Sequence, residues 1–230
     1  MAKETSKLDF LESPEALADK ITSVQPFFEK NKTAILGICG AIVAAVALFF
    51  GYTWYTNTQD EEGQAALSPL VYQMESDSLD AALKGKAGKA TLLTVADDFG
   101  SSAAGNLANF YAGVALLKQS KYDEAIDKLK SFSSSDLLVQ ARAYSLIGDA
   151  YSEKGNTEEA ISAYKKAADY KPNQFFTPIY LLKLGVAQEK AKQYKEAVES
   201  YNTITEKYPL SAEFGSAKKY KAQAEGLAGE

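Results

Sequence analysis

The sequence contains no histidine. Histidine is the commonest general base and the commonest metal ligand, so its absence excludes histidine-dependent hydrolysis and most zinc or non-haem iron sites. The single cysteine, Cys39, cannot form an intrachain disulfide, and because it lies in an apolar run we expect it to be a small apolar filler. The sequence therefore predicts no catalytic residue, no metal ligand, no cofactor-binding residue and no cofactor.

A basic stripe with interleaved aromatic residues is also missing. Lysine and arginine number 25 against 30 aspartate and glutamate, a formal net charge of −5, which argues against nucleic acid as a partner. No nucleophile has an adjacent base, and the stretch Gly85–Lys89 has no apolar strand before it, so we expect a turn there rather than a phosphate loop. An enzyme built on carboxylates or tyrosines alone is the rival interpretation. We favour a binding protein without a small-molecule substrate.

One uncharged run, from Ala34 to Tyr55, is long enough to cross a bilayer. As an α-helix it would measure about 33 Å, close to the hydrocarbon thickness of about 30 Å. A cleaved signal peptide is the competing interpretation, but the leader of 32 residues is long and small residues for cleavage are absent at the far end. That end carries the aromatic cluster of a membrane interface, Phe49, Phe50, Tyr52, Trp54 and Tyr55. We predict one transmembrane helix.

The flanking charges predict how this helix is oriented. Lys30 and Lys32 precede the run, whereas Asp60, Glu61 and Glu62 follow it. Because cytoplasmic flanks are enriched in basic residues, the leader is predicted to be cytoplasmic and the large domain to lie on the far side. For a single-pass protein of the bacterial inner membrane, this orientation places the large domain in the periplasm.

Small residues recur at four-residue spacing within the run. Such spacing lets a second helix approach closely, so we predict membrane-helix packing at Gly37, Gly40, Ala41, Ala44 and Ala45. The alternative is that glycine and alanine are simply common in membrane spans. Before the run, Ser13 and Pro14 followed by a short apolar stripe predict a short amphipathic helix that Pro26 interrupts.

After the run, one pattern recurs. Gly113, Gly148 and Gly185 lie in mostly apolar stretches, separated by 35 and 37 residues. Each is followed after twelve residues by an alanine and four residues later by a large side chain, giving Ala125 and Leu129, Ala160 and Tyr164, and Ala197 and Tyr201. This pattern resembles tetratricopeptide repeats, in which two antiparallel helices cross at the small residues. The predicted fold is all-α, one N-terminal transmembrane helix followed by a tetratricopeptide-like α-solenoid.

The same patterns divide the chain into segments. Lys218, Lys219 and Lys221 give the last segment the polar outer face of a terminal cap. The predicted segments are a cytoplasmic leader at 1–32, the transmembrane helix at 33–57, a helical pre-repeat region at 58–103, three repeats at 104–209 and a capping helix at 210–230.

The order of leader, membrane helix and repeat domain resembles the ancillary-subunit family of the bacterial Sec translocon over nearly the whole chain. The resemblance includes the segment Pro26–Lys32 and the aromatic end Tyr52–Tyr55. It implies a non-enzymatic scaffold whose partners are the translocon channel, a membrane-anchored chaperone similar to prolyl isomerases, and newly exported polypeptides. Repeat motifs specify fold better than function. A scaffold for assembly of cell-envelope or cell-division machinery is therefore the alternative.

The resemblance to tetratricopeptide arrays also implies a binding face. In such arrays the concave face is lined by first-helix positions three before, one after and four after the glycine. The predicted partner-binding residues are Phe110, Val114, Leu117, Ser145, Asp149, Ser152, Leu182, Val186 and Glu189. These positions lack the lysine, arginine and asparagine that grip a carboxylate in some arrays, so an apolar helix or extended segment is the better ligand. The alternative is that residues 60–100 of the chain itself fill the groove.

Overall fold

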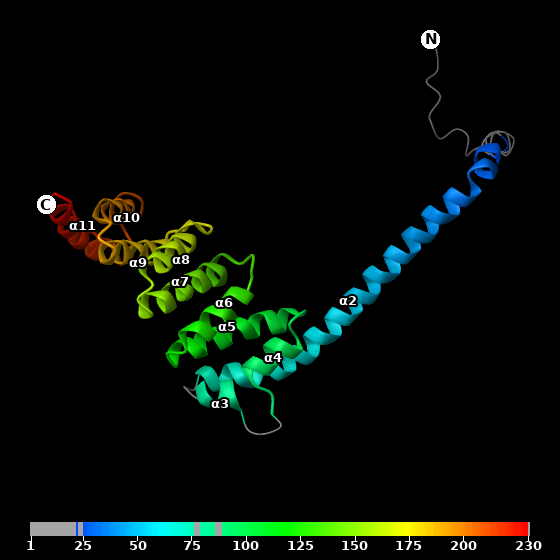
Figure 1. The fold of residues 1–230 in the computed structure, drawn as a ribbon, viewed down its shortest axis with the longest axis horizontal. Coiled ribbons are helices and arrows are strands. Elements are labelled where there is room, and N and C mark those ends of the chain that lie inside the picture. The colour runs from blue at the N-terminus through cyan, green and yellow to red at the C-terminus, as the bar shows by residue number, and fades with distance from the viewer. Residues whose placement is uncertain (1–21, 23–24, 76–78, 86–88, 230) are drawn as a thin grey trace, which may run out of the picture. The chain divides into compact units, whose positions relative to one another are not determined.

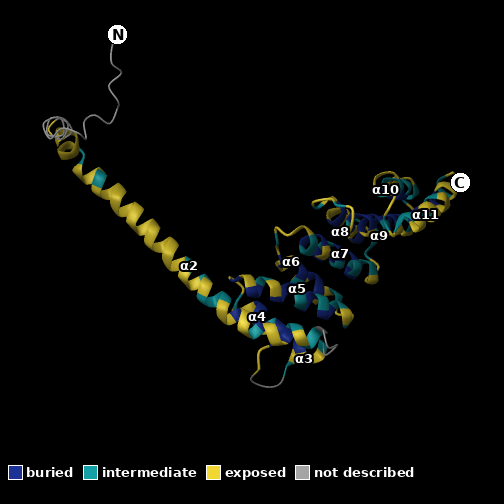
Figure 2. Ribbon diagram, turned by 180° about the vertical axis from the view of Figure 1, so that it is seen from behind, coloured by how far each residue is buried: buried dark blue, intermediate teal, exposed yellow. Residues whose placement is uncertain are grey.

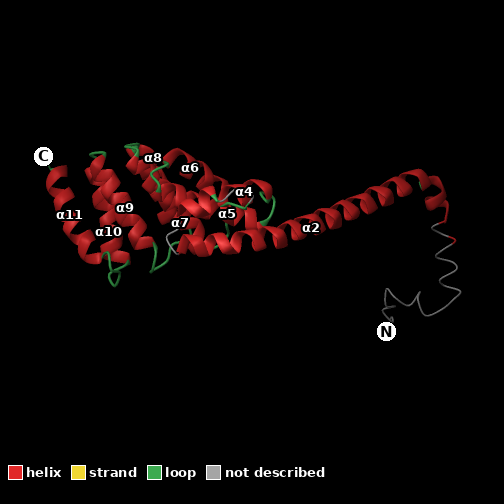
Figure 3. Ribbon diagram, turned by 90° about the horizontal axis from the view of Figure 1, so that it is seen from below, coloured by secondary structure: helices red, strands yellow, loops and turns green. Residues whose placement is uncertain are grey.

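All regular structure in the described part of the chain is helical. The computed structural model describes residues 22, 25–75, 79–85 and 89–229, and within these ranges helices are joined by short loops without any strand (Figure 3). The chain divides into two compact units, Met1–Tyr55 and Thr56–Glu230. The predicted all-α fold class is confirmed. The amphipathic leader helix predicted after Ser13 lies almost entirely outside the described residues.

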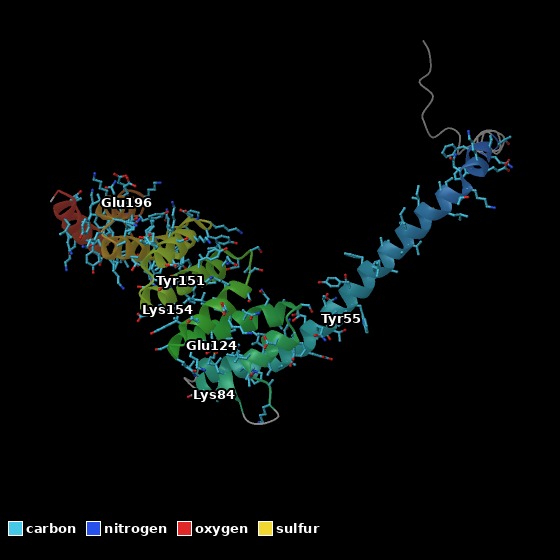
Figure 4. The ribbon with its side chains drawn as sticks, viewed as in Figure 1. Tyr55, Lys84, Glu124, Tyr151, Lys154 and Glu196 are labelled. Atoms are coloured by element: carbon cyan, nitrogen blue, oxygen red, sulfur yellow. The ribbon has the colours of Figure 1, made fainter. Side chains whose placement is uncertain are left out.

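The longest helix, α2 (Lys32–Glu75), begins in the first unit. It contains an 18-residue window with a mean hydropathy of 2.5, none of which is buried. Large apolar side chains along it are exposed, among them Leu48 at 75% and Trp54 at 72%, and Tyr55 projects from the helix (Figure 4). By length and composition, this helix is able to cross a membrane.

The second unit is a stack of paired helices (Figure 1). Each helix packs on the next along the chain, as expected for a solenoid in which repeats touch only their neighbours. The three pairs are α5 (Ala103–Lys118) with α6 (Tyr122–Ser131), α7 (Leu137–Glu153) with α8 (Thr157–Asp169), and α9 (Thr177–Lys190) with α10 (Tyr194–Lys207). The flanking helices are α3 (Leu79–Lys84), α4 (Leu92–Asp98) and α11 (Phe214–Ala228), of which α3 and α4 contact α5 and α11 contacts α9 and α10.

A glycine in the first helix of each pair receives the large side chain of the second helix. A Cβ atom on Gly148 would lie 2.6 Å from the ring of Tyr164, and one on Gly185 would lie 2.4 Å from the ring of Tyr201. In the first pair, a Cβ atom on Gly113 would lie 2.5 Å from Cγ of Leu129. Because only glycine leaves this space, the repeating glycine sets how closely the two helices approach.

The turn inside each pair is also repeated. Seven residues after each glycine, Ser120, Gly155 and Lys192 have positive φ angles of 60°, 81° and 62°. The next backbone N–H in each turn donates to a carbonyl five residues earlier, at 3.0, 2.9 and 2.8 Å, which is the Schellman arrangement that ends a helix. Only the middle turn has the glycine that this conformation favours, so Ser120 and Lys192 carry backbone strain of order 1 kcal/mol.

The buried core follows the stack as three clusters of apolar side chains. One joins α2 through α6, the second joins α5 through α8, and the third joins α7 through α11. Buried residues run along α5, α7 and α9, each of which has a helix packed on either side of it (Figure 2). Tyr201, Leu92 and Leu116 are among the largest side chains that are fully buried.

Residues 56–75 of α2 belong to this second unit and attach to α5. The Asp60 carboxylate accepts a hydrogen bond of 2.7 Å from the backbone N–H of Ala104, in the first turn of α5. Ser102 caps the same end through its hydroxyl, which accepts from Gly105 at 3.1 Å. A carboxylate at a helix N-terminus is favoured by the helix dipole. Further along α2, Leu67 and Leu70 are each 4% exposed and belong to the apolar cluster that joins α2 through α6.

Replacement of Gly185 by alanine should destabilise the repeat stack. Its Cβ would press on the ring of Tyr201, which is 0% exposed and has no space to move into. Overpacking of this kind costs about 1–3 kcal/mol, and each kcal/mol lowers the melting temperature by about 2–4 °C in a domain of this size. Circular dichroism during heating measures the change. Gly226→Ala in α11 is the matched control, because nothing lies within 4 Å of its added Cβ, and an equal loss in both variants would contradict the packing argument.

Candidate functional site

The predicted concave-face residues lie on α5, α7 and α9, but they differ in accessibility. In the first pair, Phe110 is only 7% exposed and its ring lies 5.2 Å from that of Phe132, centroid to centroid. Val114 and Leu117 are half-buried against the neighbouring apolar clusters. In the third pair, Leu182 is half-buried, whereas Val186 is 48% exposed. The accessible apolar position of the third pair is therefore Val186.

The predicted polar positions of α7 belong to a network that joins the second and third pairs. The Lys183 ammonium donates to both carboxylate oxygens of Asp149, each at 2.7 Å, and more weakly to the Ser145 hydroxyl at 3.4 Å. The Tyr164 hydroxyl donates to Asp149 at 2.7 Å. Ser145 is 3% exposed, while Ser152, the third predicted position of α7, is half-buried. These side chains already have partners inside the protein, so they position α9 on α7.

The last predicted position, Glu189, has a similar internal partner. The Tyr201 hydroxyl donates to its carboxylate at 2.5 Å. Burial, followed by this hydrogen bond, raises the pKa of Tyr201, and burial together with the charge of Asp149 raises the pKa of Tyr164. Both phenols therefore stay protonated and act as donors at neutral pH. The ring of each tyrosine packs against the glycine of the first helix, and its hydroxyl donates a hydrogen bond to a carboxylate of the same helix.

An apolar groove lies beside the first pair, where α2, α5 and α7 meet. It is a hollow of about 490 Å³ that contains two of the predicted residues, Phe110 and Val114. A second hollow of about 390 Å³ lies between α2 and α5. It adjoins the first hollow, since Val71, Leu107 and Tyr111 line both of them. The other residues of the first hollow are Met74, Lys118, Leu138, Val139 and Arg142.

The predicted concave face could be open to a partner or filled by residues 60–100 of the chain itself, and the contacts of α2 bear on this choice. Val71 and Met74 of α2 pack on the cluster that joins α2 through α6, as do Tyr111 and Leu117 of α5, so the upstream segment covers part of the first pair. It forms one wall of the groove and leaves the hollow in place. The sequence indicated that residues 60–100 could meet this face, but it did not assign Val71, Met74, Lys118 or Arg142 to a groove, because the glycine register of the repeats says nothing about a non-repeating helix or about positions beside the motif.

In the first unit, the five predicted membrane-helix packing positions are exposed on α2: Gly37, Gly40, Ala41, Ala44 and Ala45. A Cβ added at Gly37 or Gly40 would meet nothing within 4 Å. Their role in packing against another helix stays a prediction.

No group of three or more histidine, cysteine, aspartate or glutamate side chains suited to a metal ion occurs among the described residues.

Comparison with known families agrees with the repeat geometry. Residues 141–174 match one tetratricopeptide repeat family and residues 180–211 match a second one, and the two matches correspond to α7 with α8 and to α9 with α10. The chain therefore carries tetratricopeptide repeats, a class of helical repeat that typically binds proteins without catalysing a reaction. A search of curated proteins found no match to the chain.

Replacement of Asp149 by alanine should destabilise the stack between its second and third pairs. The change removes the acceptor of both Lys183 and Tyr164, and a partly buried polar group left unpaired costs about 1–3 kcal/mol. A thermal unfolding curve measures the loss. Asp123→Ala is the matched control, since it breaks the ion pair between Asp123 and Lys154 at the protein surface, where Asp123 is 81% exposed. If both variants melt alike, the network is not a structural contact of the kind described.

Proposed function

We propose that this protein is a non-enzymatic scaffold held in a membrane by α2, with its repeat unit presented to partner proteins on the far side. The observation that carries the proposal is an apolar groove on a tetratricopeptide stack, in a chain with a helix able to cross a membrane. Protein segments are the natural ligands of such a groove, because a repeat stack offers a long surface and no reactive group.

The particular scaffold that we propose is an ancillary subunit of the bacterial Sec translocon. The resemblance in leader, membrane helix and repeat order supports this assignment. In this role the leader is cytoplasmic, the repeats are periplasmic, and the partners are the translocon channel, a membrane-anchored chaperone similar to prolyl isomerases and exported polypeptides. The concave-face residues, with Val186 the most accessible apolar one, would contact these partners.

Protease digestion should reveal the proposed topology. In a Gram-negative host, proteinase K is expected to degrade the repeat unit once the outer membrane is opened osmotically, and to leave it intact in closed cells. Intact mass of the purified chain should still include residues 1–55, since a permanent anchor is not removed. Protection of the repeats in opened cells, or a chain that begins after Tyr55, would contradict the proposal.

Crosslinking should identify the partners. A photoreactive residue at Val186 is expected to crosslink to a translocon component or a chaperone, because this side chain is 48% exposed at a predicted concave-face position. The same residue at Lys165, exposed on α8, is the matched control and should give far fewer crosslinks. Crosslinks from Val186 only to envelope-assembly or cell-division proteins would favour the alternative scaffold, and equal patterns from both positions would argue against a concave binding face.

A further inference from the structure

We propose that the groove formed by α2, α5 and α7 binds an apolar segment of a partner protein that carries acidic residues. This inference rests on the proposed scaffold function and specifies the chemistry of the ligand. It concerns the upstream helix, the first pair and the facing side of α7, and it does not depend on Val186 or on the third pair.

The floor and walls of the groove are apolar and come from three helices. Val71 and Met74 belong to α2, Phe110 and Val114 to α5, and Leu138 to α7. The adjoining hollow extends the apolar surface along α2 and α5 through Leu67 and Ala104, with no charged residue in its lining. The two hollows together have room for several apolar side chains of one peptide, which is how an amphipathic segment docks in a helical groove.

The only charged residues that line the first hollow are cations. Lys118 lies in the last turn of α5 and Arg142 lies on α7, so the two charges come from different walls. Both side chains are exposed, and neither forms an ion pair with a carboxylate among the described residues. Arg142 is the single arginine of a chain whose net charge is −5. The charged residues that line this apolar groove are therefore basic, although the chain as a whole has a net negative charge.

These two cations select the ligand by charge. Guanidinium is suited to a carboxylate because it can donate two parallel hydrogen bonds, whereas a lysine or arginine of a basic segment would be repelled. A segment with apolar residues on one side and glutamate or aspartate beside them satisfies both features of the groove. The concave-face positions predicted from the sequence lack such cations, because Lys118 and Arg142 fall outside the positions three before, one after and four after each glycine.

Peptide binding to the full chain in phosphatidylcholine nanodiscs tests this inference. The probe is a fluorescein-labelled peptide of about fifteen residues composed of leucine, phenylalanine and glutamate, compared with a partner peptide in which lysine replaces each glutamate. Fluorescence polarisation should show that the acidic peptide binds about tenfold or more tightly than the basic one, a preference that weakens as salt is added. Empty nanodiscs measure peptide partition into lipid, and equal signals from empty and loaded discs would overturn the inference.

Charge reversal at the two cations provides the decisive variant. Lys118→Glu with Arg142→Glu should weaken the acidic peptide about tenfold and favour the basic peptide. Lys165→Glu with Lys195→Glu changes the net charge equally at exposed positions of α8 and α10, and should leave the preference intact. Lys118→Gln with Arg142→Gln, which should lose the preference without reversing it, keeps the test open if the reversed variant unfolds. Unfolding is recognised by circular dichroism.

A pair of leucine substitutions locates the peptide. Leu107→Asp, within the groove, should abolish binding of the acidic peptide, whereas Leu137→Asp should not, although the two leucines are 36% and 43% exposed. Equal binding of both peptides, no binding of either one, or a preference that survives charge reversal would overturn the inference. Crosslinks from Val186 test the scaffold function separately from peptide binding. A failed peptide-binding test can therefore be distinguished from a failure of the proposed scaffold function.

Discussion

The repeat unit depends on the contact between a first-helix glycine and one large side chain of the second helix. Leu129, Tyr164 and Tyr201 occupy the space that a side chain at Gly113, Gly148 or Gly185 would need. In the two tyrosine pairs the same residue also donates a hydrogen bond, to Asp149 in one pair and to Glu189 in the other. Shape and hydrogen bonding thus act through one side chain, which fixes both the distance between paired helices and the orientation of the face that they present.

That arrangement explains why the predicted concave-face positions differ in accessibility. In the second pair, the carboxylate of Asp149 is engaged by Tyr164 and by Lys183 of the next repeat, so the polar positions hold the stack together. In the first pair, the apolar positions turn toward α2 and form a groove. The surface suited to a ligand therefore lies where the repeats meet the non-repeating helix.

Much of this fold is predictable from the sequence, because glycine at regular spacing has one simple structural meaning in paired helices. The all-α class, the three pairs and the turns between them follow from that spacing together with the apolar pattern. The groove does not follow from it. Val71 and Met74 reach the first pair only because Asp60 and the leucines after it dock α2 on α5, a contact that joins residues 44 apart and leaves no periodic signal. The polar network was missed for another reason: the glycine spacing predicts where paired helices cross, but it does not show that Lys183 of the third pair donates to Asp149 of the second.

The two ends of the stack are closed by helices that do not belong to the repeat pattern. Residues 56–75 of α2 cover α5 at one end, and α11 covers α9 and α10 at the other. Among the described residues, these two helices lie on the terminal pairs in the way that capping helices lie on the end repeats of a solenoid. A repeat inserted between two existing pairs would meet the same kind of neighbour on both sides, whereas one inserted next to α11 would have to take over the contacts that α11 makes with α9 and α10.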